Sequence, residues 1–452
     1  MNAADFGFSA TASGLDNTRA LQRAVDRGGT IAVTVPGCYR IAGTVYLGSH
    51  TALKFGHGVT LQKVDEAGPF THVLLNKGAL TKTYDEHILV EGLSLQVNGI
   101  DFCDWTIYGL RGQIAFFYVH DLTIRGFRCL DLGKSQFAIH VCTFEDLIVE
   151  DVIVHGDKDG IHLGRGKRYR ISNGVFKTFD DAIALNGHDY ASGNPELGWI
   201  EDGLVENCHD LNADKVLGFF CRILAGAWID WIPGMIVQNS DTVVSHGRLY
   251  RVRGKPDGQT FASHTPPSHN TGTRIFDGIH WVMVQDDVNY DAGVRRVVFR
   301  DIILSKPRIG FSVHFDEDRF SRSFYPGSKA PMQRQLYFDH ITVAYPEHQE
   351  LISICTPVDG LTITNTTFRD SPISFYDRAA TIDQGTTRVS LIGCTFTAEG
   401  PFELLANSAP HKTVILKTIG SIVLEESFSA SASATSGTNI IKSDLPGLSD
   451  GS

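Results

Sequence analysis

The sequence lacks the features that mark several large classes of protein. No stretch of its 452 residues approaches the ~18 consecutive apolar residues of a membrane-spanning helix. Its eight cysteines include no Cys-x-x-Cys pair, so neither a zinc-ribbon nor a thioredoxin-like motif is present. Acidic residues (51) outnumber basic residues (40), and the net charge of −11 disfavours a nucleic-acid-binding protein. We therefore expect neither a membrane nor a nucleic acid as the partner of this chain.

The first residues also lack the pattern of a secretory signal. The segment 1–4 (Met-Asn-Ala-Ala) contains neither a basic region nor an apolar region. Two interpretations stay open from these residues: a cytoplasmic protein, or the mature form of an exported one.

What the sequence does contain is a short recurring pattern. Alternating apolar residues, typical of a strand, are followed by Asn, Asp or Gly, which can supply the left-handed residue of a tight corner. The pattern begins at Leu122, Leu147, Tyr169, Leu204, Val297, Leu336, Leu361 and Val389. The first three starts are nearly evenly spaced, with no helical pattern between them. This period predicts an all-β fold, a single-stranded right-handed parallel β-helix.

A shift by one such period brings similar side chains into columns. One column holds Ile139, Ile161 and Ile183, and the adjacent column holds His140, His162 and Ala184. Because successive coils of a β-helix lie ~4.8 Å apart, the isoleucine column is expected to face the interior. Alternation along the strand then sends the histidine column outward. A β-sandwich with accidental periodicity is the alternative fold.

The whole chain, 1–452, is expected to be a single parallel β-helix domain. Residues 1–60 would form the N-terminal cap and the first coils. Within them, apolar residues at helical spacing predict a short capping helix behind Asp16 or Asn17 as the N-cap. The Ser- and Ala-rich sequence within 427–452 predicts a flexible or irregular C-terminal tail.

Two segments, 187–202 and 254–296, break the coil period. We expect both to be long loops that leave the β-helix at one corner and frame a binding cleft.

The densest group of reactive side chains comprises Asp159, Asp180 and Asp181. Asp159 and Asp181 are separated by the same shift as the isoleucines, so we expect them one coil apart on the same corner. Gathered carboxylates repel one another, which raises at least one pKa toward a value useful for a general acid. Opposed carboxyl groups ~6.5–9.5 Å apart would suit a glycosidase that inverts the anomeric centre. The alternatives are capping of the corner and binding of calcium.

Several other side chains could contact a sugar. His162 and His188 lie near the acidic residues in the sequence, where they could bind hydroxyl groups. Trp199, Trp228 and Trp231 could stack on sugar rings as walls of subsites. For each tryptophan, packing in the core is the alternative interpretation.

From Asp5-Phe-Gly7 to about residue 260, the order of motifs resembles the family 28 glycoside hydrolases, the polygalacturonase family of the pectate-lyase-like β-helix superfamily. Asp157-Lys-Asp159-Gly is similar to that family's Asn-Thr-Asp-Gly, and Asp180-Asp181-Ala-Ile-Ala-Leu is similar to its Asp-Asp pair. The resemblance implies that Asp180 is the general acid. It also implies that Asp159 and Asp181 hold the attacking water as base.

Two further motifs of the family have only loose counterparts. Gly-His-Gly corresponds to Gly218-Phe-Phe or, one coil further on, to Ser-His246-Gly. Arg-Ile-Lys, which binds the substrate carboxylate, corresponds to Arg222-Ile-Leu or to Arg251-Val-Arg. The resemblance thus implies that Arg222, His246 and Arg251 contact the substrate, and these departures favour a glycan other than polygalacturonate.

Together these features predict a glycosidase that cleaves a polysaccharide or oligosaccharide with inversion, without a cofactor or metal. The resemblance implies a secreted or periplasmic protein that degrades a pectin-like substrate. One alternative is a calcium-dependent polysaccharide lyase with Arg222 or Arg251 as base. Another is a non-catalytic, tailspike-like β-helix that binds glycans. The sugar, the choice between endo and exo cleavage, and the oligomeric state stay open.

Overall fold

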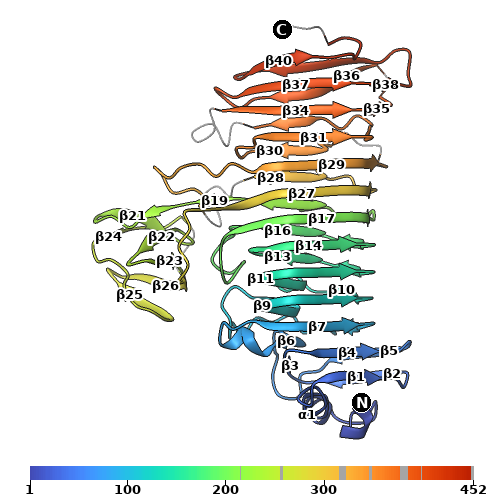
Figure 1. Cartoon of the computed structure of the whole chain (residues 1–452), viewed down its shortest axis with the longest axis vertical. Coiled ribbons are helices and arrows are strands. Elements are labelled where there is room, and N and C mark those ends of the chain that lie inside the picture. Colours follow the sequence, from blue (N-terminus) through green and yellow to red (C-terminus); the bar gives the residue numbers. More distant parts are fainter. Residues whose placement is uncertain are drawn as a thin grey trace.

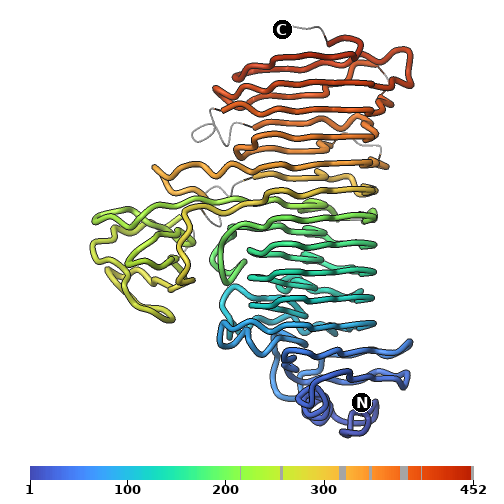
Figure 2. Tube along the Cα trace, in the orientation of Figure 1, coloured from blue at the N-terminus to red at the C-terminus, as the bar shows by residue number. Residues whose placement is uncertain are grey.

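A computed structural model describes residues 1–213, 215–254, 258–314, 322–345, 349–376, 385–398 and 400–448. The chain forms a tall stack of coils that rises from the N-terminus to the C-terminus (Figures 1 and 2). Equivalent strands of successive coils pair in parallel, with almost no helix between them. The parallel β-helix predicted from the repeat is therefore confirmed.

Three long sheets run along the stack. The first sheet contains β1 (Gly29–Val33), β4 (Thr51–Phe55), β7 (Asp85–Glu91), β9 (Gly112–Arg125), β11 (Phe137–Glu150), β14 (Gly166–Ser172), β17 (Trp199–Asp210), β27 (Asp291–Leu304), β29 (Arg334–Val343), β31 (Gly360–Thr364), β34 (Thr386–Ile392), β37 (Thr413–Ile419) and β40 (Thr438–Lys442). The second contains β2 (Gly37–Ile41), β5 (Val59–Lys63), β8 (Ser94–Gln96), β10 (Arg128–Leu132), β12 (Ile153–Gly156), β15 (Val175–Thr178), β32 (Thr367–Phe368), β35 (Thr395–Phe396) and β38 (Ile422–Val423). The third contains β3 (Val45–Leu47), β6 (Leu74–Asn76), β13 (Ile161–Leu163), β16 (Ile183–Asn186), β18 (Cys221–Leu224), β28 (Phe311–His314), β30 (Ile352–Ile354), β33 (Ile373–Phe375), β36 (Pro401–Asn407) and β39 (Ser429–Ala434). Five of the first-sheet strands are long enough to bend around a corner into a neighbouring sheet: β9 and β11 begin in the third sheet, and β17, β27 and β29 end in the second.

The predicted columns are present in the third sheet. Ile139 pairs with Ile161, and Ile161 pairs with Ile183, and all three side chains are fully buried in the core. Burial of one such side chain contributes roughly 1.5–3 kcal/mol to folding. The adjacent column does lie on the outer face, but it is covered: His140 is buried, and its Nε2 lies 3.0 Å from Oδ1 of Asn194.

The N-terminal end of the stack is capped by α1 (Gly14–Val25), beside a short 3₁₀ helix, η1 (Ala3–Phe6). The helix begins earlier than Asp16 or Asn17 would give, because the Ser13 hydroxyl oxygen accepts a hydrogen bond from the Asp16 amide (3.1 Å). Its apolar face is buried in the main core. A second 3₁₀ helix, η2 (Lys77–Leu80), follows β6. No helix in the described part of the chain is long and apolar enough to cross a membrane.

The predicted flexible or irregular tail, 427–452, is wrong over most of its length. β39 pairs with β36 and β40 pairs with β37, so these residues form another coil. Ala430 and Ile441 point into the core and extend the apolar ladder. The small and polar residues of this segment suggested disorder. A strand of the stack, however, needs only every second residue to be buried. Residues 449–452 lie outside the described part.

The first predicted loop is shorter than expected, and the second is part of an ordered subdomain that starts earlier in the chain. The first ends where β17 begins, at Trp199, so only 187–198 is irregular. In place of the second, a lateral subdomain projects from the stack (Figure 1). It contains β20 (Ile229–Asp230), β21 (Met235–Gln238), β22 (Thr242–Ser245), β23 (Arg248–Val252), β24 (Thr260–Ser263), β25 (Thr273–Phe276) and β26 (Ile279–Gln285), and a short strand, β19 (Gly226–Ala227), precedes it.

The lateral subdomain has a separate hydrophobic core that includes Tyr250 and Trp281. Most of its strands pair in antiparallel fashion with near neighbours in the chain, so they carry no trace of the coil period. That is why the period gave only a loop for 254–296. The single-domain organisation of 1–452 stays a prediction.

Candidate active site

The three aspartates lie at one corner, between the second and third sheets. Asp159 comes shortly before β13, and Asp180 and Asp181 come shortly before β16. The next coil reaches the same corner with Gly218, which has φ +62°. A Cβ atom at Gly218 would lie 2.7 Å from the Asp180 carbonyl carbon and 2.8 Å from Asp181 Oδ1. Only glycine therefore fits there, and we call Asp159, Asp180 and Asp181 the acidic corner.

The acidic corner is a close cluster of carboxylates. One carboxylate oxygen from each aspartate lies within 4.8 Å of the others. Stacking on neighbouring coils, with only ~4.8 Å of rise between them, explains how Asp159 comes so close to the other two. The separation of ~6.5–9.5 Å between opposed carboxyl groups stays a prediction. The Asp180 side chain is 21% exposed, whereas Asp159 and Asp181 are buried. Asp180 is therefore the member that a ligand can reach.

The three carboxyl groups differ in their proton affinity. Burial and the charge of Asp159 raise the pKa of Asp180, and Lys158 offsets this only in part. Burial, followed by the charges of Asp180 and Asp159, raises the pKa of Asp181 well above its usual range. Burial alone would also raise the pKa of Asp159, but Lys158, His162 and Arg111 together lower it. The acidic corner thus combines Asp159, whose pKa is lowered, with Asp180 and Asp181, whose pKa values are raised.

Lys158 is the residue that ties Asp159 to Asp180. Its ammonium group contacts Asp180 Oδ2 and lies 3.6 Å from Asp159 Oδ1. Burial would lower the pKa of Lys158, but Asp159, Tyr190 and Asp180 raise it above its ordinary value. Lys158 therefore stays protonated. Lys158 lies within the motif Asp157-Lys-Asp159-Gly. The sequence gives no indication, however, that its side chain is directed toward Asp159 and Asp180.

A pocket of about 280 Å³ opens beside the acidic corner. It is lined by Lys134, Asp157, Lys158, Phe179, Asp180 and Lys215. This places the accessible carboxyl group of Asp180 in the wall of a concave site, together with an aromatic ring. Such a pocket has room for about one sugar residue in contact with Asp180.

His162 is a buried hydrogen-bonding partner of Asp159. Its Nδ1 donates a hydrogen bond to Asp159 Oδ2 (2.9 Å), and its ring stacks on Phe137 with centroids 4.0 Å apart. Nε2 lies 3.6 Å from Oδ2 of Asp189, a buried carboxylate in segment 187–198. The sequence correctly placed His162 beside Asp159. Because its side chain is only 1% exposed, however, it contacts that carboxylate rather than a ligand.

Arg222 also reaches the acidic corner. It occupies the outer column of the third sheet, where it pairs with Ala184, and its charge lowers the pKa values of both Asp180 and Asp181. Sequence reasoning missed Arg308, which is far from Asp180 in the chain and donates from Nη1 to the Asp180 carbonyl oxygen (2.8 Å). A buried ion pair with Asp210 (2.8 Å) fixes that guanidinium. No local motif surrounds Arg308, so only the stacking of coils reveals it.

The other predicted contacts lie elsewhere. His188 is buried next to Trp228, with ring centroids 5.9 Å apart, and the indole N–H of Trp228 donates to the Asn289 carbonyl oxygen (2.7 Å). Three more lie apart from the acidic corner, in the lateral subdomain: Trp231, His246 and Arg251. These five side chains are not brought to the acidic corner.

Trp199 lies in a second pocket, of about 260 Å³, on the first sheet. Its indole N–H donates to Asp291 Oδ1 (2.8 Å), and the Arg295 guanidinium lies 4.7 Å from the ring centroid. Arg165, directly before β14, and Lys167, within β14, also line this pocket, and each is paired with a carboxylate. Trp199 is therefore placed to contact a ligand, but on a different face from the acidic corner.

Comparisons with known proteins show the fold. The sequence matches no protein-family model and no curated protein sequence. Among solved structures, the chain is similar to a surface adhesin of Streptococcus pneumoniae (12% identity, 100% of this chain and 95% of that one, TM-score 0.54). It is also similar to the catalytic unit of a family 87 α-1,3-glucanase from Streptomyces thermodiastaticus (14% identity, 99% and 70%, TM-score 0.55).

A third similar structure is a family 28 exopolygalacturonase of Yersinia enterocolitica (10% identity, 97% and 77%, TM-score 0.51). At such identities the similarity is one of fold alone, so it confirms the parallel β-helix, and membership of the pectate-lyase-like superfamily stays a prediction. Membership of family 28 itself stays a prediction.

Proposed function

We propose that this protein is a glycoside hydrolase whose catalytic groups are Asp159, Asp180 and Asp181. The observation that carries the proposal is the gathering of three close carboxyl groups, in which the pKa of Asp159 is lowered and the pKa values of Asp180 and Asp181 are raised. Hydrolysis of a glycosidic bond requires one carboxylic acid and one carboxylate at the same bond. The solved structures of similar fold that are described as glycosidases agree with this class of reaction.

The roles follow from exposure and charge. Asp180 lines the pocket and favours its protonated form, so it donates the proton to the leaving oxygen. Asp159 is ionised and is oriented by His162, so it accepts the proton of the attacking water. Asp181 accepts a hydrogen bond from the Phe219 amide (2.9 Å) and lies behind the pair. Lys158, which contacts Asp180 and lies 3.6 Å from Asp159, supplies a positive charge beside both carboxyl groups.

Inversion is the course that the resemblance implies, with water held by Asp159 and Asp181. Inverting and retaining enzymes differ in the separation of their two carboxyl groups, ~6.5–9.5 Å against ~5–5.5 Å. The anomeric form of the first product distinguishes the two courses. A screen of plant, algal and bacterial polysaccharides identifies the substrate, and proton NMR of the fresh product then determines the anomeric form.

The same screen separates the alternatives. Hydrolysis releases new reducing ends, whereas a lyase forms unsaturated ends that absorb ultraviolet light. A lyase needs an unprotonated base, and Lys158, the cation in contact with Asp180, has a raised pKa. Arg251 lies in the lateral subdomain, apart from the acidic corner. Binding of a glycan without any new ends would instead support an adhesin-like module and contradict the proposal.

A further inference from the structure

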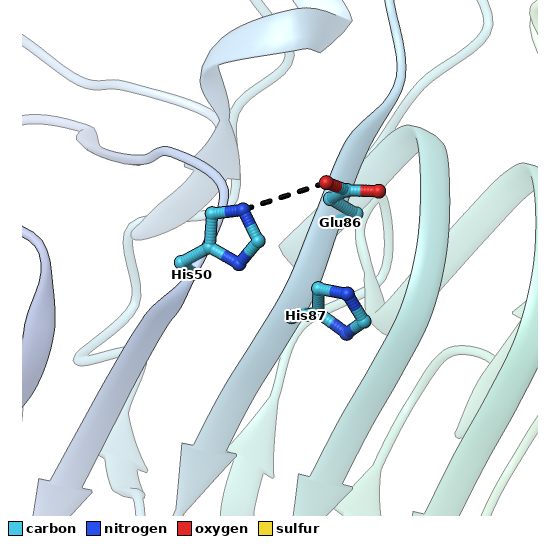
Figure 3. A group of neighbouring side chains, drawn as sticks. All are labelled: His50, Glu86 and His87. Atoms are coloured by element: carbon cyan, nitrogen blue, oxygen red, sulfur yellow. Dashed lines mark ion pairs between the residues drawn. The ribbon is translucent and has the colours of Figure 1, made fainter.

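Close to the N-terminal end of the stack, a second corner collects side chains of a different kind. His50 directly precedes β4, and Glu86 and His87 belong to β7 on the next coil. The register of β4 with β7 puts His87 directly above His50, and the register of β7 with β9 puts Asp121 above His87. Figure 3 shows both imidazoles and the Glu86 carboxylate gathered on this surface. We call His50, Glu86 and His87 the histidine corner.

The backbone fixes this arrangement. His50, His87 and Asp121 all have left-handed conformations, with φ of +58°, +56° and +48°. Each is the corner residue of its coil, so their Cα atoms are stacked by the parallel pairing rather than by the side chains. A non-glycine residue in this conformation is held there at a cost of roughly 1 kcal/mol, which the surrounding sheet supplies.

The potential ligand atoms are close together. A nitrogen of each imidazole and an oxygen of Glu86 all lie within 4.8 Å of one another. Nε2 of His50 is 3.4 Å from Oε1 of Glu86, and the two imidazole rings stack with centroids 5.1 Å apart. The side chains are 65%, 51% and 56% exposed, so they can rotate to shorten these distances.

Asp121 completes the arrangement. Its Oδ2 lies 2.6 Å from Nδ1 of His87, which fixes the ring and leaves Nε2 for another partner. Histidines that bind metals commonly donate their second ring nitrogen to a carboxylate in this way, and the contact raises the basicity of the ligand.

We propose that His50, Glu86 and His87 bind a zinc ion, or another divalent cation that prefers imidazole. Two imidazole nitrogens and one carboxylate oxygen are a known zinc ligand set, and water supplies the fourth position. Ligands ~2.0–2.1 Å from zinc lie ~3.3 Å apart in a tetrahedron, so the present spacing must contract by at most ~1.5 Å. Calcium and magnesium are disfavoured because they require oxygen ligands.

The ion would join two coils. His50 comes from the coil of β4, whereas Glu86 and His87 come from the coil of β7, so zinc adds a bridge between them. A ligand that binds only the folded state stabilises it in proportion to its occupancy. The first coils, next to α1, are where such a bridge resists fraying of the stack.

The test is calorimetric titration of the full chain with zinc chloride. We expect one zinc per chain, a rise in Tm with zinc, and at least a tenfold loss of affinity in His50→Ala and in His87→Ala. Asp121→Asn, which alters the partner of His87, should weaken binding about 10-fold. His340→Ala is the matched control. His340 also has a left-handed backbone conformation, and its Nδ1 lies 2.6 Å from Oδ1 of Asp301 on the neighbouring coil. Within the described residues, however, His340 belongs to no cluster of metal-binding side chains.

Circular dichroism verifies that each variant folds. If His87→Ala fails to fold, Glu86→Gln replaces it, because that substitution keeps the shape of the side chain and removes the charged ligand. The proposal is overturned if the wild type binds no zinc at millimolar concentration, or if tight binding persists in His50→Ala and His87→Ala. Tight binding in both variants would mean that zinc binds at another site. Equal losses in His340→Ala and His87→Ala would also contradict it.

Discussion

The acidic corner and the histidine corner are built in the same way but differ in burial. In each, residues of neighbouring coils are stacked by parallel pairing, and their polar atoms lie within 4.8 Å of one another. The acidic corner buries two of its three carboxyl groups almost completely, whereas all three side chains of the histidine corner are exposed. Burial turns proximity into large pKa shifts. Exposure leaves the same proximity available for a metal ion.

The largest expected effect tests the acidic side of this comparison. Asp180→Asn removes the proton donor and Asp159→Asn removes the ionised base, so each should lower kcat by about 100- to 10,000-fold. Assays of reducing ends on the glycan identified by the screen measure it, with circular dichroism to verify folding. Asp301→Asn, a substitution of an exposed corner aspartate, is the control and should change kcat less than about twofold. Full activity in a folded Asp180→Asn would contradict the assigned roles.

A smaller change is expected when the cation of the acidic corner is removed. Lys158 lowers the pKa values of Asp159, Asp180 and Asp181, so Lys158→Met should raise all three. Activity then extends to higher pH, because Asp180 stays protonated longer, and falls earlier at low pH. The pH dependence of kcat/KM measures both limbs. Lys177→Met, on the exposed side of β15, should leave them in place.

The next effect concerns stability. Asp181 has a raised pKa in the folded state, so its contribution is present below the pKa of the unfolded chain and is lost as pH rises through the folded value. Each unit of such a shift destabilises the fold by about 1.4 kcal/mol at high pH. Asp181→Asn cannot ionise and can still accept the hydrogen bond of the Phe219 amide.

We therefore expect Asp181→Asn to unfold at a temperature similar to wild type at about pH 4 and at a higher temperature at about pH 8. Thermal unfolding followed by circular dichroism measures the difference. A variant that is less stable than wild type at both pH values would mean that the carboxylate is better satisfied than its burial indicates.

The smallest effect belongs to the histidine corner. In the absence of metal, Glu86→Gln should change the free energy of unfolding by less than about 0.5 kcal/mol, because exposed ion pairs contribute little. Urea titration in the presence of a chelator measures this. A loss of stability above about 2 kcal/mol is typical of buried rather than surface substitutions. It would show that Glu86 contributes as a buried residue does, and it would contradict the contrast between a buried acidic corner and an exposed histidine corner.

The period of the sequence predicted the coils and the isoleucine column because parallel stacking repeats the same chemistry once per coil. It also brought Asp159 and Asp181 to one corner and placed His162 beside them. It could not find Arg308 or the histidine corner, since the number of residues between their members differs from the period of the sequence. Nor could it predict the lateral subdomain, whose strands pair mainly with near neighbours in the chain.

The tryptophans and histidines illustrate a second limit. His188 follows the acidic motif closely, yet it is buried next to Trp228, because segment 187–198 folds over the third sheet. Sequence position next to a reactive group does not establish exposure. Trp199 is accessible, but it faces a pocket on another sheet.

The central claim is that burial and neighbouring charges together divide one cluster of aspartates into an acid and a base. The pH dependence of kcat/KM in the wild type tests it most directly, because it reports the pKa values of the free enzyme. We predict a bell-shaped profile whose alkaline limb lies above the usual range of an aspartate, set by Asp180, and whose acid limb lies below that range, set by Asp159. A profile without an alkaline limb would contradict the account.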